Sequence, residues 1–285
     1  MTQFHVVCDS TADLDPPTAA ALGVTVVPLR VIFGEEEYLD GPEMSTAEFY
    51  RRMQVDPHHP RTSQPTPAEF EAAFRRVGSD GGSIICSTIS SGLSGTYGSA
   101  MQARAALPDL DIHVVDSQSV GPTVTAAVEM AVTIRDRGAD VTTAVAALER
   151  LREKQRLLFA LSSLEYLHRG GRIGGGAAFL GTMLSIKPIL TVVDGKIEAL
   201  DRVRTYPKAL TRLIEEVAAS AREWGPTSVI AAHAANPTEG QNMAERLAAI
   251  TGTMPRIVEI GAVLGCHAGP GAFGIGLHPT AVIDG

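Results

Sequence analysis

The chain has 285 residues, of which 45% are hydrophobic and 20% are charged, a composition typical of a folded globular protein. Its formal net charge of −8 leaves no general basic surface to meet phosphates, so nucleic-acid binding is not expected. The length suits one large domain or two ordinary ones.

Cysteine spacing and hydropathy argue against a zinc-binding protein and a membrane-spanning protein. Cys8, Cys86 and Cys266 form no CxxC pair, and Cys8 and Cys86 lie in apolar runs, so these two are expected to be buried free thiols. Cys266 is next to His267 but has no further ligands at metal-binding spacing, so no zinc site is expected. No cofactor is expected. Charge interrupts the apolar stretches before they reach the length of a membrane span, as Glu129 does in 120–134. The N-terminus lacks the basic region of a signal peptide. We therefore expect a cytoplasmic protein without integral membrane association.

In the first half of the chain, β-branched and apolar runs alternate with helical patterns. N-capping signals indicate helices after Asp15 and after the capping boxes that begin at Ser45 and Thr66. Because this alternation is typical of parallel sheets with right-handed crossovers, we expect a parallel sheet here. The expected strands are 4–8, 24–33, 83–86 and 112–115, and the later helices are expected at 101–107, 123–137 and 141–154.

The pattern changes near residue 155. Asp194-Gly195 stands between two apolar runs and predicts a two-residue β-hairpin, which together with further helices is typical of an α+β domain. We therefore predict an α/β protein with an N-terminal parallel-sheet α/β domain over residues 1–155 and a second α+β domain over residues 156–285. In the second domain, strands are expected at 157–161, 189–193, 196–200, 228–232, 256–260 and 273–277, and helices at 207–224 and 237–250.

Two segments of the first half carry polar groups suited to an anionic ligand. Arg61-Thr62-Ser63-Gln64-Pro65 precedes a capped helix and is expected to be a loop, although an ordinary polar turn is the reading that this segment alone favours. The run Ser87–Tyr97 follows a strand, at the edge where open α/β sheets bind ligands. Around Ser94 it lacks the final glycine of a nucleophile elbow and the lysine of a P-loop. It therefore indicates a polar-ligand loop rather than a catalytic motif.

The second half adds a histidine and a group of basic residues. His267 is flanked by glycines in the run 265–271, which we expect to be a loop, and its imidazole could bind a carboxylate or serve a structural role. Arg172 stands among glycines, and its planar guanidinium suits phosphate or carboxylate. A solvated surface is the better interpretation for Lys196 and Lys208.

Taken in order, the motifs closely resemble the DegV family, whose members include the fatty-acid-binding subunits of bacterial fatty acid kinase. The resemblance runs nearly end to end, and the ordered set is far more specific than any single motif. The matching motifs are Asp9-Ser10-Thr11-Ala12-Asp13-Leu14, Val27-Pro28-Leu29, Tyr38-Leu39-Asp40-Gly41, Thr62-Ser63-Gln64-Pro65, Ser90-Ser91-Gly92-Leu93-Ser94-Gly95-Thr96-Tyr97, Asp116-Ser117, Leu164-Glu165-Tyr166-Leu167-His168-Arg169-Gly170-Gly171-Arg172-Ile173, Ile186-Lys187-Pro188-Ile189-Leu190 and His267-Ala268-Gly269-Pro270-Gly271.

This resemblance implies a carrier that is not itself an enzyme, with one long-chain fatty acid such as palmitate lying between its two domains. It assigns the carboxylate to the hydroxyls of Thr62 and Ser94 and to His267. It further implies that Arg172 and Arg204 lie near the head group or contact a separate fatty acid kinase that makes an acyl phosphate.

The physics of burial agrees with this assignment. Hydroxyl contacts contribute about 0.5–1.5 kcal/mol each. Burying about fifteen methylenes at ~0.8 kcal/mol each offers on the order of 12 kcal/mol before ordering costs. The affinity must therefore come mainly from an apolar pocket. Two alternatives remain open, which are a lipid transport or sensing protein without a kinase, and a hydrolase that uses Ser94 and His267.

Overall fold

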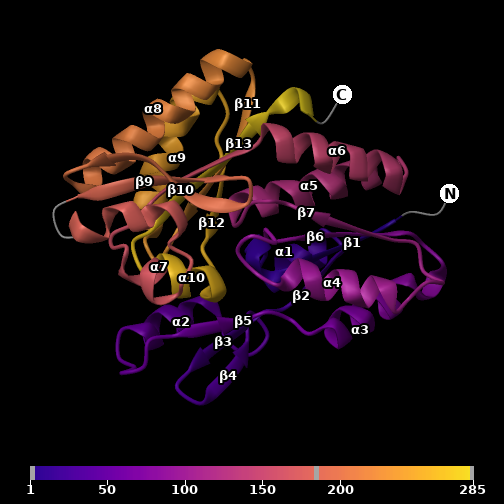
Figure 1. Cartoon of the computed structure of the whole chain (residues 1–285). Helices are drawn as coiled ribbons and strands as arrows, with labels where there is room; N and C mark the ends of the chain where they lie inside the picture. The colour runs from indigo at the N-terminus through magenta and orange to yellow at the C-terminus, as the bar shows by residue number, and fades with distance from the viewer. Residues whose placement is uncertain (1–3, 183–185, 283–285) are drawn as a thin grey trace.

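The computed structural model describes residues 4–182 and 186–282, and its first sheet is entirely parallel (Figure 1). Its strand order is β2-β1-β6-β7, in which β1 and β6 are the central pair. The order confirms the predicted parallel α/β architecture of the first half. The strands are β1 (His5–Asp9), β2 (Val24–Val27), β6 (Ile84–Thr88) and β7 (Ile112–Asp116).

Helices cover both faces of this sheet, and their starts follow the capping signals in the sequence. Asp15 accepts a hydrogen bond from the backbone N–H of Thr18, and Thr66 forms a reciprocal capping box with Glu69. These side chains satisfy backbone donors that a helix start leaves unpaired. The helices are α1 (Pro16–Ala21), α3 (Pro67–Val77), α4 (Thr96–Ala105), α5 (Pro122–Asp136) and α6 (Val141–Lys154), with short 3-10 turns at Ser10–Ala12 and Gly78–Asp80.

The single strand expected over 24–33 is wrong, because the chain changes sheets at Pro28. Proline has no N–H with which to continue the ladder, and β3 (Arg30–Phe33) instead enters a three-stranded antiparallel sheet of order β4-β3-β5. Residues 61–63, expected in a loop, form the edge strand of this sheet, where Thr62 pairs with Val31. The remaining elements are β4 (Glu36–Leu39), β5 (Arg61–Ser63) and α2 (Thr46–Met53).

The second half forms a six-stranded mixed sheet of order β10-β9-β8-β13-β11-β12. The predicted hairpin is present, and Asp194 and Gly195 at its turn have φ values of 49° and 75°, the left-handed pair that a type I′ turn requires. The strands are β8 (Arg156–Ala160), β9 (Lys187–Val193), β10 (Lys196–Val203), β11 (Thr227–His233), β12 (Arg256–Glu259) and β13 (Phe273–Pro279).

His267 lies on a helix and not in the expected loop. The apolar run from Ala262 buries one face of α10, and Gly269, with φ of 73°, ends the helix just beyond His267. The flanking glycines therefore mark a helix end. The other elements of this half are α7 (Glu165–Arg169), a 3-10 segment (Gly174–Thr182), α8 (Tyr206–Trp224), α9 (Pro237–Thr251), α10 (Ala262–Ala268) and a 3-10 turn (Thr280–Val282).

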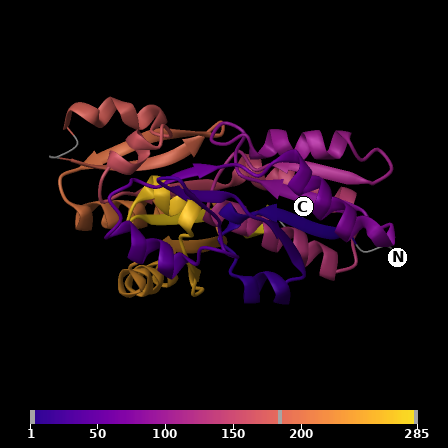
Figure 2. The same ribbon diagram turned by 90° about the horizontal axis from the view of Figure 1, so that it is seen from below.

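Packing between their elements joins the halves. Helix α5 packs against β1 and β6 of the parallel sheet and also against β8, β11 and β13 of the mixed sheet. The small sheet and α2 pack against α10, so Val31 and Phe49 share one hydrophobic core with Ile260 and Val263. In Figure 2 the violet ribbon of this small sheet lies beside the yellow α10, among elements of the second half.

Substituting Gly195 tests how the hairpin turn docks on the first half. Gly195 and Gly252 both have positive φ, 75° and 74°, so alanine at either site carries a left-handed backbone cost of about 1–2 kcal/mol. At Gly195 the added Cβ would also lie 2.5 Å from Ser90 Oγ, whereas no described atom lies within 4 Å of a Cβ at Gly252. We expect urea unfolding to show a further loss of about 1–3 kcal/mol for Gly195→Ala relative to Gly252→Ala. Equal losses would mean that the turn does not depend on this contact.

Candidate functional site

A cavity with about 850 Å³ of empty volume, part of it open to solvent, lies where the two large sheets, the small sheet and α10 meet. Its walls are mostly apolar, and the polar side chains among its described lining residues are Thr62, Ser94, Arg172 and His267. Such a concave apolar site with a few polar groups is the usual form of a small-molecule pocket. The apolar walls include Leu29, Ile89, Phe159, Leu161, Ile197 and Val263.

Thr62 and His267 form the best-defined polar contact of the cavity. Thr62 Oγ1, on β5, lies 2.9 Å from His267 Nε2, on α10. Burial, with smaller contributions from the nearby Arg172 and His59, lowers the pKa of His267 to about 4. The imidazole is therefore neutral near pH 7, and together with the hydroxyl it can offer a hydrogen-bond donor to an anion without a formal charge.

Glycine brings a second element against this imidazole. A Cβ at Gly170 would lie 2.1 Å from His267 Nδ1, so only glycine allows the end of α7 to approach so closely. Nδ1 is buried and has no hydrogen-bond partner among the described atoms. Gly170 belongs to a motif found in the sequence, but its role depends on a contact with His267 that residue spacing does not predict.

Ser94 reaches the cavity from the turn between β6 and α4. Its Oγ lies 2.9 Å from Thr96 Oγ1 and accepts a hydrogen bond from the Thr96 backbone N–H at 3.3 Å, which fixes the side chain just before α4. The turn is held by close approaches at its glycines. A Cβ at Gly92 would lie 2.6 Å from the Gly195 carbonyl oxygen, and one at Gly95 would overlap the Gln64 amide. The glycines thus allow the hairpin and β5 segments to pack against the Ser94 turn.

Arg172 lies at the exposed side of the cavity. Its Nε donates to the carbonyl of Leu93 at 3.2 Å, and its Nη1 donates to the carbonyl of Gly170 at 2.8 Å. The guanidinium therefore bridges the Ser94 turn and the end of α7. Arg204 is exposed between β10 and α8 and is not among the described residues that line the cavity.

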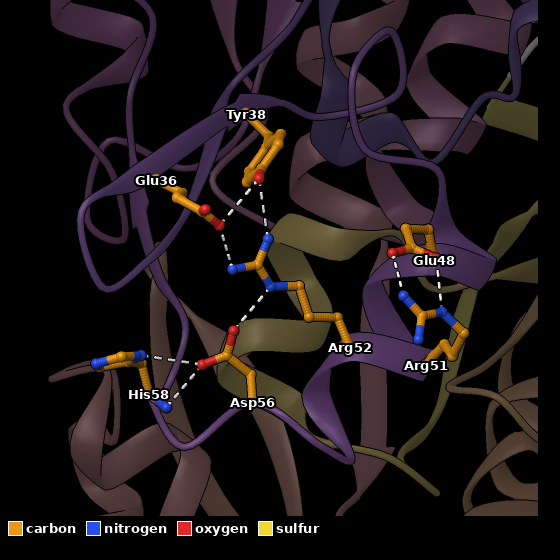
Figure 3. A network of polar contacts seen from close by, with 7 residues as sticks. All are labelled: Glu36, Tyr38, Glu48, Arg51, Arg52, Asp56 and His58. Atoms are coloured by element: carbon orange, nitrogen blue, oxygen red, sulfur yellow. Dashed lines mark hydrogen bonds and ion pairs between the residues drawn. The ribbon is translucent and has the colours of Figure 1, made fainter.

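The strand that carries Thr62 is supported by an ion-pair network around Arg52 (Figure 3). Arg52 on α2 donates to Glu36 at 2.5 Å, to Tyr38 at 3.0 Å and to Asp56 at 2.8 Å. Asp56 in turn accepts from the His58 backbone N–H at 2.8 Å. Helix α2, β4 and the segment leading into β5 are therefore held together by one guanidinium.

A second cavity has acidic walls, unlike the apolar first one. It has about 1890 Å³ of empty volume and lies against α1 and β12, with carboxylates of Asp13, Asp40 and Glu259 in its lining. Acidic walls do not suit an anionic ligand. Within 4–182 and 186–282, no group of three or more His, Cys, Asp or Glu side chains is arranged to hold a metal ion.

The described helices also include none that is both long and apolar enough to cross a membrane.

Comparison with known proteins agrees with this architecture. A family described as "Uncharacterised protein, DegV family" matches residues 3–280. The chain belongs to the DegV family. It is 35% identical to a DegV domain-containing protein from Halalkalibacterium halodurans, over 96% of this chain and 98% of that protein.

Solved structures of DegV proteins share the fold. One described as showing fatty acid binding of a DegV family protein from Thermus thermophilus has a TM-score of 0.89 and 32% identity, over 98% of this chain and 100% of that one. A stearic acid-binding protein from Eubacterium ventriosum has a TM-score of 0.90 and 29% identity, over 98% of both chains. The predicted α/β fold is thus confirmed, and these structural neighbours bind fatty acids.

Histidine-selective NMR can test the electrostatics of this DegV site. The folded pKa of His267, about 4, lies below its ordinary value of 6.5, so folding favours the neutral imidazole. The stability that this preference contributes is present above pH 6.5 and is lost as the pH falls toward 4. We expect an imidazole that stays neutral at pH 5.5, and a pH-dependent loss on the order of 3 kcal/mol that is absent in His267→Asn. An imidazole that titrates near pH 6.5 would contradict the burial argument.

Proposed function

We propose that this DegV protein binds one long-chain fatty acid, with the acyl chain in the apolar cavity and the carboxylate held by Thr62, Ser94 and His267. The observation that carries the proposal is the placement of these three side chains on one cavity whose other described walls, apart from Arg172, are apolar. The fatty acids bound by its structural neighbours support it. The protein acts in this proposal as a cytoplasmic carrier without a cofactor.

The polar side chains and the apolar walls contribute differently to the proposed binding. Neutral hydroxyls and a neutral imidazole replace the water around a carboxylate and add about 1.5–3 kcal/mol each, since the acceptor is charged. Each buried methylene adds ~0.8 kcal/mol, so a chain of about fifteen supplies most of the affinity. The polar groups therefore select the carboxylate and fix its position, while the walls retain the chain.

We further propose that the protein presents the bound carboxylate to a separate ATP-dependent fatty acid kinase for acyl-phosphate formation. Arg172 supports this because it is exposed at the cavity and bridges two segments next to the head-group site. Phosphoryl transfer requires positive charge close to the transferred group. Arg204, outside the cavity, fits a contact with the kinase rather than with the lipid. A transport or sensing role without a kinase uses the same binding site.

A hydrolase based on Ser94 and His267 fits the geometry less well. In a catalytic triad one histidine nitrogen bonds the serine and the other bonds an acid. Here Nε2 contacts Thr62, while Nδ1 is buried without a partner in the described part of the chain. Ser94 instead bonds Thr96. The arrangement is that of a hydrogen-bonding clamp.

Removing the two hydroxyls tests the head-group assignment. Thr62→Val combined with Ser94→Ala should weaken binding of a C16–C18 fatty acid about tenfold or more, since two hydrogen bonds to a carboxylate are lost. Binding of the corresponding methyl ester should change far less. Isothermal titration calorimetry measures both ligands. The control is Ser79→Ala with Thr253→Val, which removes two exposed hydroxyls remote from the cavity. Equal losses for acid and ester would contradict the assignment.

Replacing Arg172 tests the kinase role. Arg172→Ala should leave fatty acid affinity nearly unchanged but lower acyl-phosphate formation with a cognate kinase about tenfold or more, because positive charge beside the phosphoryl group is lost. Arg204→Ala should lower it through weaker docking. Arg169→Ala is the matched control, since Arg169 is an exposed arginine paired with Glu165 on α7. Turnover equal to wild type in Arg172→Ala would remove this part of the proposal.

A further inference from the structure

Helix α10, which carries His267, has no N-cap side chain of its own. Its N-cap residue is Gly261, which supplies no side-chain acceptor for the backbone N–H groups of the first turn. Unpaired donors at a helix start cost free energy unless a side chain or water accepts from them. The acceptors come from residues about 220 positions or more earlier in the chain.

Two carboxylates provide this cap from outside the helix. Asp13 Oδ1 accepts from the Gly261 N–H at 3.0 Å. Asp40 lies at the same helix start, with its Oδ1 4.0 Å from where a Cβ on Gly261 would stand, and the backbone N–H groups of Ala262 and Val263 favour its charged form and so act to lower its pKa. Asp40 is only 7% exposed, so its geometry is fixed by the surrounding protein.

The residues before Asp13 link the start of α10 to the cavity wall on the side of the Ser94 turn. Asp9 at the end of β1 accepts from the Thr11 N–H at 2.8 Å, and its second oxygen accepts from the Ile89 N–H at 2.7 Å. Ile89 lines the cavity and leads into the turn that carries Ser94. The Asp9–Asp13 motif therefore contacts both the Ser94 turn and α10.

Helix α10 is rigid enough to transmit the position of its N-terminus to His267. The helix rises ~1.5 Å per residue, so His267 lies less than about 10 Å from the cap. Gly265 packs against Phe49 and Tyr50, because a Cβ there would lie 2.5 Å from the Phe49 ring. Tyr50 also donates to the Ile260 carbonyl at 3.0 Å. These contacts hold α10 in one orientation, so the groups that fix its N-terminus also help to fix the position of His267.

We infer that Asp13 and Asp40 are positioning residues of the head-group site, which act through α10 to hold His267 Nε2 against Thr62. This inference rests on the proposed fatty acid binding. Neither residue is among the described residues that line the acyl cavity, so neither contacts the ligand. They instead fix the position of His267, which contacts the ligand in the proposed function.

The charge of these residues is not what the role requires. Burial raises the pKa of Asp40 to about 6 and raises that of Asp13 as well, so the site tolerates a neutral acceptor. Asparagine keeps an oxygen acceptor of the same shape, whereas alanine leaves the N–H groups of α10 without a partner. The two substitutions therefore separate the hydrogen bonds from the charge.

The experiment measures fatty acid affinity by calorimetry in Asp13→Ala and Asp40→Ala and in the two Asn variants. We expect the Ala variants to bind about tenfold more weakly and the Asn variants to stay within about threefold of wild type. Asp140→Ala is the matched control, because Asp140 caps α6 by accepting from Thr143, remote from His267. It should lose stability without losing affinity.

A double-mutant cycle with Thr62→Val distinguishes positioning from general loss of structure. If Asp40 acts through the His267–Thr62 contact, Asp40→Ala should weaken binding less than about twofold once Thr62 is valine. The His267 side-chain ¹⁵N shifts should change in Asp40→Ala and recover in Asp40→Asn.

Additive losses, or Ala variants with wild-type affinity, would overturn the inference. A wild-type protein that binds no fatty acid would instead overturn the proposed function. If an Ala variant does not fold, weak binding by its folded Asn counterpart would equally overturn the inference.

Discussion

The 2.9 Å contact between Thr62 and His267 joins residues 205 positions apart in the chain. It holds because the small sheet, through Val31 of its central strand, shares one hydrophobic core with a short helix of the second half, and β5 pairs with that central strand. The cavity lies directly beside this contact, so its polar end exists only when both halves are in place. Burial keeps the imidazole neutral, and a neutral imidazole next to a hydroxyl suits a single carboxylate better than it suits proton transfer.

Much of the fold follows from local signals in the sequence. The parallel sheet, the Thr66 capping box and the Asp194-Gly195 hairpin depend on neighbouring residues and could be predicted. The expected strand over 24–33 was wrong because Pro28 ends one ladder and the chain starts another in a separate sheet. Helix α10 was missed because glycines at both of its ends indicate a loop, although they fit a helix N-cap and a helix end equally well.

The site was predictable only in part. The positions of Thr62, Ser94 and His267 came from motifs, and they prove to line one cavity together with Arg172. The apolar walls could not be predicted, since Leu29, Ile89 and Phe159 look like any core residue until the sheets pack around a space. The role of Gly170 is equally hidden, because the contact it permits with His267 is made in three dimensions. The same holds for the external cap on α10, whose parts are brought together only by folding.

In the proposed function, one ligand imposes three separate tasks. Apolar walls at the junction of the sheets would retain the acyl chain, the neutral side chains of Thr62, Ser94 and His267 would bind the carboxylate, and the buried acidic motif at the start of the chain would fix their position. The exposed Arg172 beside them would leave the head group accessible to a partner. Each task depends on a different set of side chains, so substitutions should affect them separately.

The most direct test of the central claim is mass spectrometry of an organic extract from the purified protein. The account predicts about one long-chain fatty acid per chain, with the acid outnumbering its neutral esters because hydroxyls and an imidazole select the carboxylate. An extract without an acyl chain, from protein that also takes up none when incubated with palmitate, would contradict it.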